Sequence, residues 1–145
     1  MKAITIQRKS WKEALKDQKP LLLPVAHNAL AARLIERAGF KAYQVGGFAL
    51  VGAMHAVPDI DLEHYGEKGK AVEDIVSAST LPVMIDGDDG YGDAKNVTRT
   101  VQSYIRMGVS ALFIEDQMAP KKCGHMSGQK VVPPEHMENK IKAAV

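Results

Sequence analysis

Residues 81–92 read LPVMIDGDDGYG, and residues 111–116 read ALFIED. In each stretch a short apolar run passes directly into Asp, Glu or Gly residues. A short apolar run that ends at turn residues is typical of a buried strand. Open α/β sheets and α/β barrels both place their functional groups at the carboxyl ends of parallel strands. The two stretches therefore indicate an α/β fold with a polar site at one edge of its sheet.

The rest of the chain alternates strands with helices, which predicts a parallel sheet covered by helices. Periodicity does not distinguish an open doubly wound sheet from a (β/α)8 barrel. No repeat, linker or low-complexity segment divides the chain, so we expect residues 1–145 to form a single domain. Residues 48–66 are predicted to be a connection that contains Gly and Pro. The predicted strands are residues 21–26, 42–47, 81–86 and 111–114, and the predicted helices are residues 10–16, 28–38, 67–79, 96–107 and 133–145.

Composition argues against several classes of protein. The 19 basic and 17 acidic residues are nearly balanced and scattered, which argues against a nucleic-acid partner. The longest apolar runs fall well short of the roughly 20 residues that span a bilayer, so we expect no membrane partner. Cys123 is the single cysteine and cannot form an internal disulfide. Because the N-terminal residues also lack a signal-peptide pattern, the expected location is the cytoplasm.

The acidic residues at the strand ends have the spacing of a metal site. Asp86 ends one predicted strand, Asp88 follows two residues later, and Glu115 ends the next strand. Neighbouring parallel strands would bring these three carboxylates to one edge of the sheet. Hard cations such as Mg²⁺ or Mn²⁺ prefer oxygen ligands of this kind. The spacing alone fits equally well an Asp- and Gly-rich turn whose carboxylates cap a helix.

A basic loop, PKKCGH at residues 120–125, follows the last predicted strand and holds the only cysteine. A thiol with basic neighbours is a candidate proton donor or nucleophile. The alternative is that Lys121 and Lys122 are solvated charges and Cys123 is an inert small residue. Residues 46–47, a Gly pair, are candidates to offer backbone N–H groups to an oxyanion, and the alternative there is a plain turn.

Three motifs, in this order and spacing, resemble the isocitrate lyase and phosphoenolpyruvate mutase superfamily. They are residues 83–92, residues 113–117 (FIEDQ) and residues 120–126 (PKKCGHM), and weaker similarity extends over most of the chain. The resemblance is strongest to the small lyases of the 2-methylisocitrate and 2,3-dimethylmalate type, because mutases and hydrolases of the superfamily typically lack the Lys-Lys-Cys-Gly-His loop.

The resemblance implies a (β/α)8 barrel that assembles into homotetramers. Such barrels have about 250 residues, whereas this chain has 145 residues and four predicted strand–helix units. The chain is therefore expected to be the N-terminal half of the barrel, with the remainder absent. A half-barrel leaves open sheet edges, which favour association.

The resemblance also implies a reaction and a cofactor. These lyases cleave a carbon–carbon bond in a 2-hydroxy di- or tricarboxylate and release a 2-keto acid and a carboxylate. Asp86, Asp88 and Glu115 would hold Mg²⁺ or Mn²⁺, and Cys123 would protonate the carbanion left by bond cleavage. Lys121 and His125 are the other implied catalytic residues. The implied substrate-binding residues are Tyr43, Gly46, Gly47, Phe48, Asp59 and Gly124.

Two alternatives to this lyase remain open. One is another reaction of the same superfamily, either oxaloacetate hydrolysis or decarboxylation or the mutase and hydrolase chemistry of phosphonates. The other is a half-barrel without activity, because an arginine that binds substrate carboxylates lies in the second half of the family's barrel. The chain also has Gly46 where many relatives have Ser, and Asp89 where many have Thr.

Overall fold

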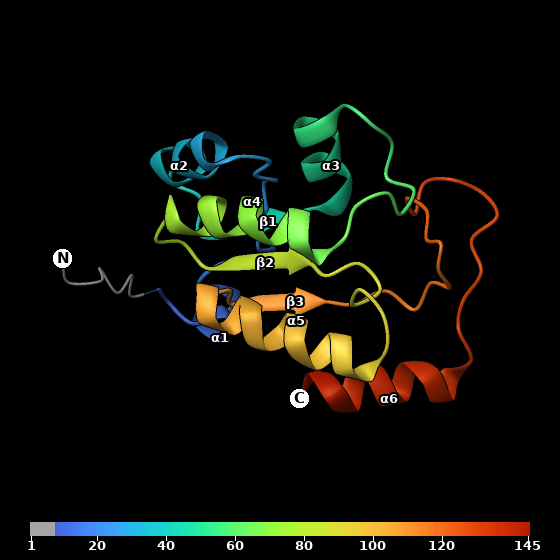
Figure 1. The fold of residues 1–145 in the computed structure, drawn as a ribbon. Helices are drawn as coiled ribbons and strands as arrows, with labels where there is room; N and C mark the ends of the chain where they lie inside the picture. Colours follow the sequence, from blue (N-terminus) through green and yellow to red (C-terminus); the bar gives the residue numbers. More distant parts are fainter. Residues whose placement is uncertain (1–7) are drawn as a thin grey trace.

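The computed structural model describes residues 8–145 and contains a parallel sheet of three strands (Figure 1). The strands are β1 (Tyr43–Val45), β2 (Val83–Asp86) and β3 (Ala111–Phe113), in the order β1-β2-β3. Residue 45 pairs with residue 85, and residue 86 pairs with residue 113, so all three strands end at the same edge of the sheet. The strand ends thus place residues that are distant in sequence side by side.

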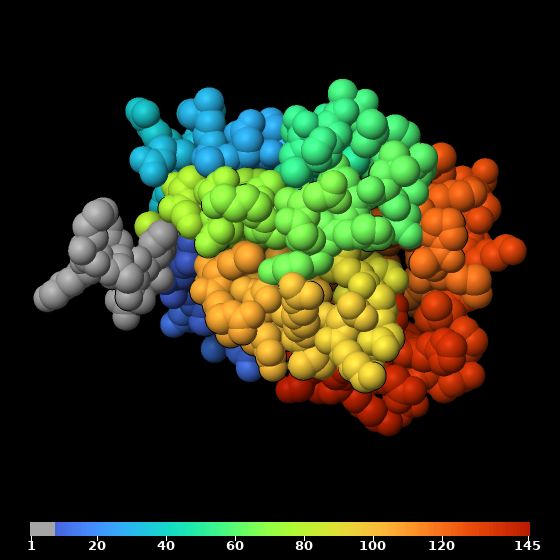
Figure 2. Space-filling model, in the orientation of Figure 1, coloured from blue at the N-terminus to red at the C-terminus, as the bar shows by residue number. Residues whose placement is uncertain are grey.

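Helices connect the strands and cover the sheet. Figures 1 and 2 show the segments of α4 and α5 lying against each other along one side of the molecule, and α6 packs against α5. None of the helices in residues 8–145 is both long enough and apolar enough to cross a membrane. The helices are α1 (Trp11–Asp17), α2 (Ala29–Arg37), α3 (Gly47–His55), α4 (Tyr65–Ser77), α5 (Ala94–Met107) and α6 (Pro134–Ala144).

Local signals in the sequence explain where several helices begin and end. Ser10 and Glu13 form the predicted capping box of α1, and the Asn28 side chain accepts a hydrogen bond from the Ala31 backbone N–H. Gly108 ends α5 with a φ of 83°, a left-handed conformation that glycine adopts readily. These helix boundaries are therefore set by residues that satisfy exposed backbone groups.

Two elements differ from the prediction. Residues 21–26 do not form a strand, because only Val25 pairs with the sheet, through one bridge to Gln44. Pro24 has no N–H to donate to a longer ladder. Residues 47–55, predicted as part of a strand end and a connection, form helix α3. This segment is apolar on almost every side, so it lacks the periodic pattern that identifies an amphipathic helix.

The core lies between the sheet and its helices. Alternate residues of β1 and β2 are buried, which is expected because successive side chains of a strand point to opposite faces. These side chains pack against helices α2, α3, α4 and α5. The core cluster consists of Ala26, Ala32, Ile35, Tyr43, Val45, Leu50, Val72, Ile75, Val76, Val83, Ile85 and Tyr104.

We predict that Ile85→Ala lowers the free energy of unfolding by about 2–5 kcal/mol, because it leaves a cavity in this core. Ile85 is 1% exposed, whereas Ile105 on the outer side of α5 is 65% exposed. Ile105→Ala is the matched control and should change stability by less than about 0.5 kcal/mol. Urea unfolding followed by circular dichroism measures both. Equal losses in the two variants would contradict this account of the core.

Candidate functional site

Charged side chains from five segments gather where β2 and β3 end. Asp86 is the last residue of β2, Asp88 lies in the turn that follows, and Glu115 lies just after β3. The other members come from the loop between α3 and α4, from α4 itself and from the loop after β3. We call this group the charged cluster, and its members are Asp59, Lys68, Asp86, Asp88, Glu115 and Lys121.

Lys121 lies at the centre of the charged cluster. Its Nζ is 2.5 Å from Asp88 Oδ1, 3.2 Å from Asp59 Oδ2 and 3.7 Å from Glu115 Oε2, and its side chain is only 2% exposed. Burial by itself would lower the pKa of Lys121, but the negative charge of these carboxylates outweighs burial and raises it. Lys121 is therefore a fixed positive charge that joins three separate segments.

Asp88 is held between two lysines. Lys68 Nζ lies 2.5 Å from Asp88 Oδ2, on the side of the carboxylate opposite Lys121. Burial would raise the pKa of Asp88, and the charges of Lys68 and Lys121 overcome this effect and lower it. The backbone is also fixed here, since the Glu115 N–H donates to the Asp88 carbonyl at 2.7 Å. The side chain of Asp88 is thus occupied by two ion pairs, and its backbone links the turn after β2 to the residues after β3.

Asp86 and Glu115 have the opposite electrostatic environment. The two oxygens of Asp86 accept backbone N–H groups of Gly47 at 3.1 Å and Asp88 at 3.0 Å. Burial, followed by the negative charge of Asp88, raises the pKa of Asp86. Burial also raises the pKa of Glu115, and the charges of Asp86 and Asp88 oppose the stabilising effect of Lys121. The negative charge of both carboxylates is therefore only partly neutralised by the lysines.

The charged cluster fits a divalent cation by its charge. Its four carboxylates and two lysines leave two negative charges when all six groups are ionised. Within residues 8–145, however, no three Asp, Glu, His or Cys side chains are arranged around a common ion position. Asp88 and Asp59 pair with lysine ammonium groups at 3.2 Å or less, whereas Glu115 is 3.7 Å from Lys121 Nζ and Asp86 accepts only backbone N–H groups within the described part of the chain. A site shared by Asp86, Asp88 and Glu115 stays a prediction.

Residues 120–125, which we call the cysteine loop, are hydrogen-bonded to the loop between α3 and α4. The Cys123 N–H donates to the Asp59 carbonyl at 2.8 Å, and the Lys121 N–H donates to Asp61 Oδ2 at 3.1 Å. Cys123 Sγ lies 3.4 Å from His125 Nδ1. These contacts bring the backbone of Cys123 against that of Asp59, and Lys121 belongs to both the cysteine loop and the charged cluster.

Gly47 is packed directly against the acids. A Cβ atom at this position would lie 3.2 Å from Asp86 Oδ2 and 3.2 Å from Asp88 Oδ1, closer than side chains ordinarily approach. At Gly46, a Cβ atom would make only ordinary contacts at 3.8 Å or more. The absence of a side chain at residue 47 therefore lets the start of α3 approach the carboxylates and donate a hydrogen bond to Asp86.

The remaining predicted substrate residues do not all lie at the charged cluster. Tyr43 is fully buried, and its hydroxyl faces the Ile75 carbonyl of α4 at 3.5 Å, so the structure does not bring its side chain to the site. Phe48 lies in the first turn of α3 with 63% of its surface exposed. Gly124 follows Cys123 in the loop, and nothing lies within 4 Å of a Cβ atom built there.

Two residues of this region, Lys68 and Asp61, are not predicted by the sequence patterns. Lys68 is 3% exposed and lies on the buried stripe of α4 together with Val72 and Ile75. A lysine within such an apolar stripe is the signal that identifies it. Asp61 has a φ of 69°, a conformation that non-glycine residues seldom adopt. No pattern in the sequence indicates this conformation.

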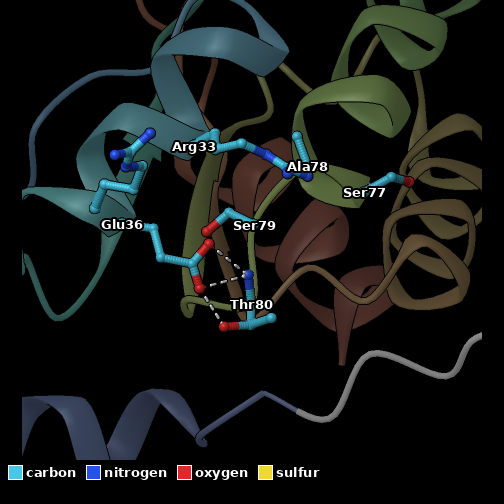
Figure 3. Close-up of a pocket in the computed structure, with 7 residues that line it drawn as sticks. Arg33, Glu36, Ser77, Ala78, Ser79 and Thr80 are labelled. Atoms are coloured by element: carbon cyan, nitrogen blue, oxygen red, sulfur yellow. Dashed lines mark hydrogen bonds between the residues drawn. The ribbon is translucent and has the colours of Figure 1, made fainter.

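A separate pocket lies at the opposite end of the sheet, before β2 (Figure 3). The Glu36 carboxylate accepts hydrogen bonds from the backbone N–H and the hydroxyl of Thr80, as the dashed lines show. The other residues that line the pocket include Arg33, Arg37 and the last residues of α4. Since Glu36 and helix carbonyl ends lie there with the arginines, this pocket gives no clear preference for an anion and is not the candidate site.

Residues 12–145 match the family model described as "Phosphoenolpyruvate phosphomutase". The chain is 42% identical over 134 residues to a 2,3-dimethylmalate lyase of Eubacterium barkeri, and the match covers 92% of this chain and 46% of that protein. It is 40% identical over 133 residues to a 2-methylisocitrate lyase of Halalkalibacterium halodurans, over 92% of this chain and 44% of that protein.

Among solved structures, the chain is similar to a phosphonopyruvate hydrolase in complex with oxalate and Mg²⁺. The TM-score is 0.75 at 32% identity, and the match covers 94% of this chain and 47% of that one. The chain therefore spans less than half the length of the relatives it matches.

We predict that Lys121→Met lowers the free energy of unfolding by about 3–5 kcal/mol, because it leaves buried carboxylates without their shared counter-charge. Lys122→Met is the control from the same loop, since no ion pair of the Lys122 side chain is formed within residues 8–145. Urea unfolding measures both variants. A Lys121 variant as stable as the Lys122 variant would show that the central ion pairs contribute nothing.

Proposed function

The chain belongs to the phosphoenolpyruvate phosphomutase family, and we propose that it acts there in a Mg²⁺-dependent carbon–carbon lyase. Membership confirms the fold expected from the sequence, since superfamily structures with the (β/α)8 barrel match the chain over 42–45% of their own length. The substrate we propose is a 2-hydroxy di- or tricarboxylate similar to 2-methylisocitrate or 2,3-dimethylmalate, and the products are a 2-keto acid and a carboxylate.

The observation that carries this proposal is the junction of the cysteine loop with the charged cluster. Lys121 provides the junction because its side chain pairs with Asp88 and Asp59 while its backbone N–H bonds Asp61. The loop that carries Cys123, the proposed proton donor, is thereby joined to the group of carboxylates. Cleavage of a carbon–carbon bond next to a carboxylate needs both functions, because the electrons left on carbon must be stabilised and then protonated.

For the metal, we propose that Asp86 and Glu115 hold Mg²⁺ or Mn²⁺, with Asp88 and Asp59 contributing charge nearby. Two observations support this role: both acids have raised pKa values, and the charged cluster has two negative charges in excess. When bound, such an ion would orient the 2-hydroxy acid and stabilise the negative charge on its hydroxyl oxygen as that oxygen loses its proton to solvent and becomes the carbonyl oxygen of the 2-keto acid.

For proton transfer, we propose that Cys123 donates its thiol proton to the carbanion, with His125 beside it at 3.4 Å. Lys121 and Gly124 position the loop that carries the thiol. Gly46 directly precedes helix α3, and Gly47 and Phe48 are its first two residues; N–H groups at the start of a helix lack helical acceptors and can bind a carboxylate. The Gly47 N–H already donates to Asp86, so Phe48 is the better donor of this set. Asp59 would act near the metal.

We further propose that residues 1–145 form one domain corresponding to the first half of the barrel, in a cytoplasmic homotetramer. A second candidate function is the alternative expected from the sequence, a half-barrel without turnover. A third is hydrolysis of oxaloacetate or a phosphonate, which the similarity to phosphonopyruvate hydrolase favours. The cysteine loop favours the lyase over the phosphonate reactions.

The proposal predicts that the protein releases a 2-keto acid from 2-methylisocitrate or 2,3-dimethylmalate in the presence of Mg²⁺, and that a chelator stops the release. Cys123→Ser should lower turnover by about 100-fold or more, the size expected for loss of a general acid, with Mn²⁺ affinity unchanged. Met126→Leu in the same loop is the control and should keep turnover. Product from oxaloacetate or phosphonopyruvate alone would favour the third candidate, and no product from any of these acids the second.

The geometry at residue 47 predicts a metal effect that needs no substrate. Gly47→Ala should weaken Mn²⁺ binding by about tenfold, because a Cβ atom displaces Asp86, and binding sites lose affinity steeply when ligands shift. Gly46→Ala should leave the affinity within about twofold, since its Cβ atom has room. Isothermal titration calorimetry with Mn²⁺ measures both variants. Equal affinity in the two would contradict a direct role for Asp86.

A further inference from the structure

Lys68 carries a buried positive charge, and the proposed function assigns no role to it. It comes from the second turn of α4, whereas the acids of the charged cluster lie at strand ends and in loops. Its side chain is 3% exposed, and its ammonium group lies 2.5 Å from Asp88 Oδ2. A lysine this deep is expensive to bury unless it is paired, so its place depends on Asp88.

The contacts of Lys68 fix the carboxylate of Asp88 from the helix side. Lys121 contacts Oδ1 and Lys68 contacts Oδ2, so each oxygen has a cation of its own. The Tyr91 ring lies beside Lys68, with its centroid 5.8 Å from Nζ. An ion that used Asp88 as a direct ligand would have to displace one of these ammonium groups. Lys68 thus opposes direct ligation by Asp88.

Lys68 also changes the charge that a cation meets. With Lys68 the charged cluster carries two excess negative charges, and one divalent ion neutralises them. Without Lys68 the excess would be three, which suits a trivalent ion. Removing a buried positive charge strengthens the attraction for any cation, and the gain is larger for an ion of higher charge because the energy scales with the product of charges.

We infer that Lys68 is a positioning residue that holds Asp88 as the partner of Lys121 and sets the charged cluster to the charge of one divalent ion. The identity of that ion rests on the proposed function, whereas the ion pair by which Lys68 holds Asp88 does not. The two parts are tested by separate measurements.

The first measurement titrates Mn²⁺ and Tb³⁺ into the 145-residue protein and its variants. Lys68→Met should bind Mn²⁺ about tenfold more tightly and Tb³⁺ more tightly by a larger factor, as the loss of one nearby charge predicts. Lys68→Arg keeps the charge and should restore the wild-type affinities. Lys70→Met removes an exposed lysine of the same helix and is the control. Unchanged or weaker Mn²⁺ binding by a folded Lys68→Met variant would overturn the charge role.

The second measurement needs no metal and tests the ion pair between Lys68 and Asp88. Urea unfolding of Lys68→Met, Asp88→Asn and the double variant forms a cycle in which the two changes should be non-additive by about tenfold in the unfolding constant. Additive effects would show that Lys68 does not hold Asp88. If Lys68→Met does not fold, Lys68→Gln replaces it in both measurements. A wild-type protein that binds no Mn²⁺ would contradict both the metal in the proposed function and the charge role of Lys68. The cycle would still decide whether Lys68 holds Asp88.

Discussion

The ion pair between Lys121 and Asp88 is the contact on which the arrangement of the site depends. Two buried charges are tolerated only when each satisfies the other, because removing them from water costs several kcal/mol for each ion. Lys121 lies in the loop after β3 and Asp88 in the turn after β2, so the pair holds two strand ends together. Through Asp59 the same ammonium group also fixes the loop before α4.

The strand ends were predictable from the sequence, because their information is local. An apolar run that stops at Asp86 and another that stops before Glu115 identify strands whose ends carry acids, and a parallel sheet has only one edge where such ends meet. The capping residues Ser10 and Asn28 were equally readable, since capping acts over three residues. The chemical roles of the acids rest on family resemblance and stay proposals.

The rest was not predictable for physical reasons that differ from element to element. Helix α3 is apolar on nearly all sides and begins with glycine, so no periodicity or capping residue marks it. Residues 21–26 have the apolar composition of a strand, but pairing depends on a partner strand and on Pro24, which has no N–H. Lys68 is a residue type that is rarely buried, and only its partner, 20 positions away, explains its place.

Two lysines divide the acids of the site into two kinds. Asp88 has a lowered pKa because both ammonium groups contact it, whereas the pKa values of Asp86 and Glu115 are raised by burial and by neighbouring carboxylates. The first kind of acid maintains the architecture and the second attracts further positive charge. Because Lys121 belongs to the cysteine loop as well as to the charged cluster, a cation that draws Glu115 away from Lys121 also alters what holds that loop. In the proposed lyase, binding of a metal at Glu115 would therefore act on the cysteine loop through the ammonium group of Lys121.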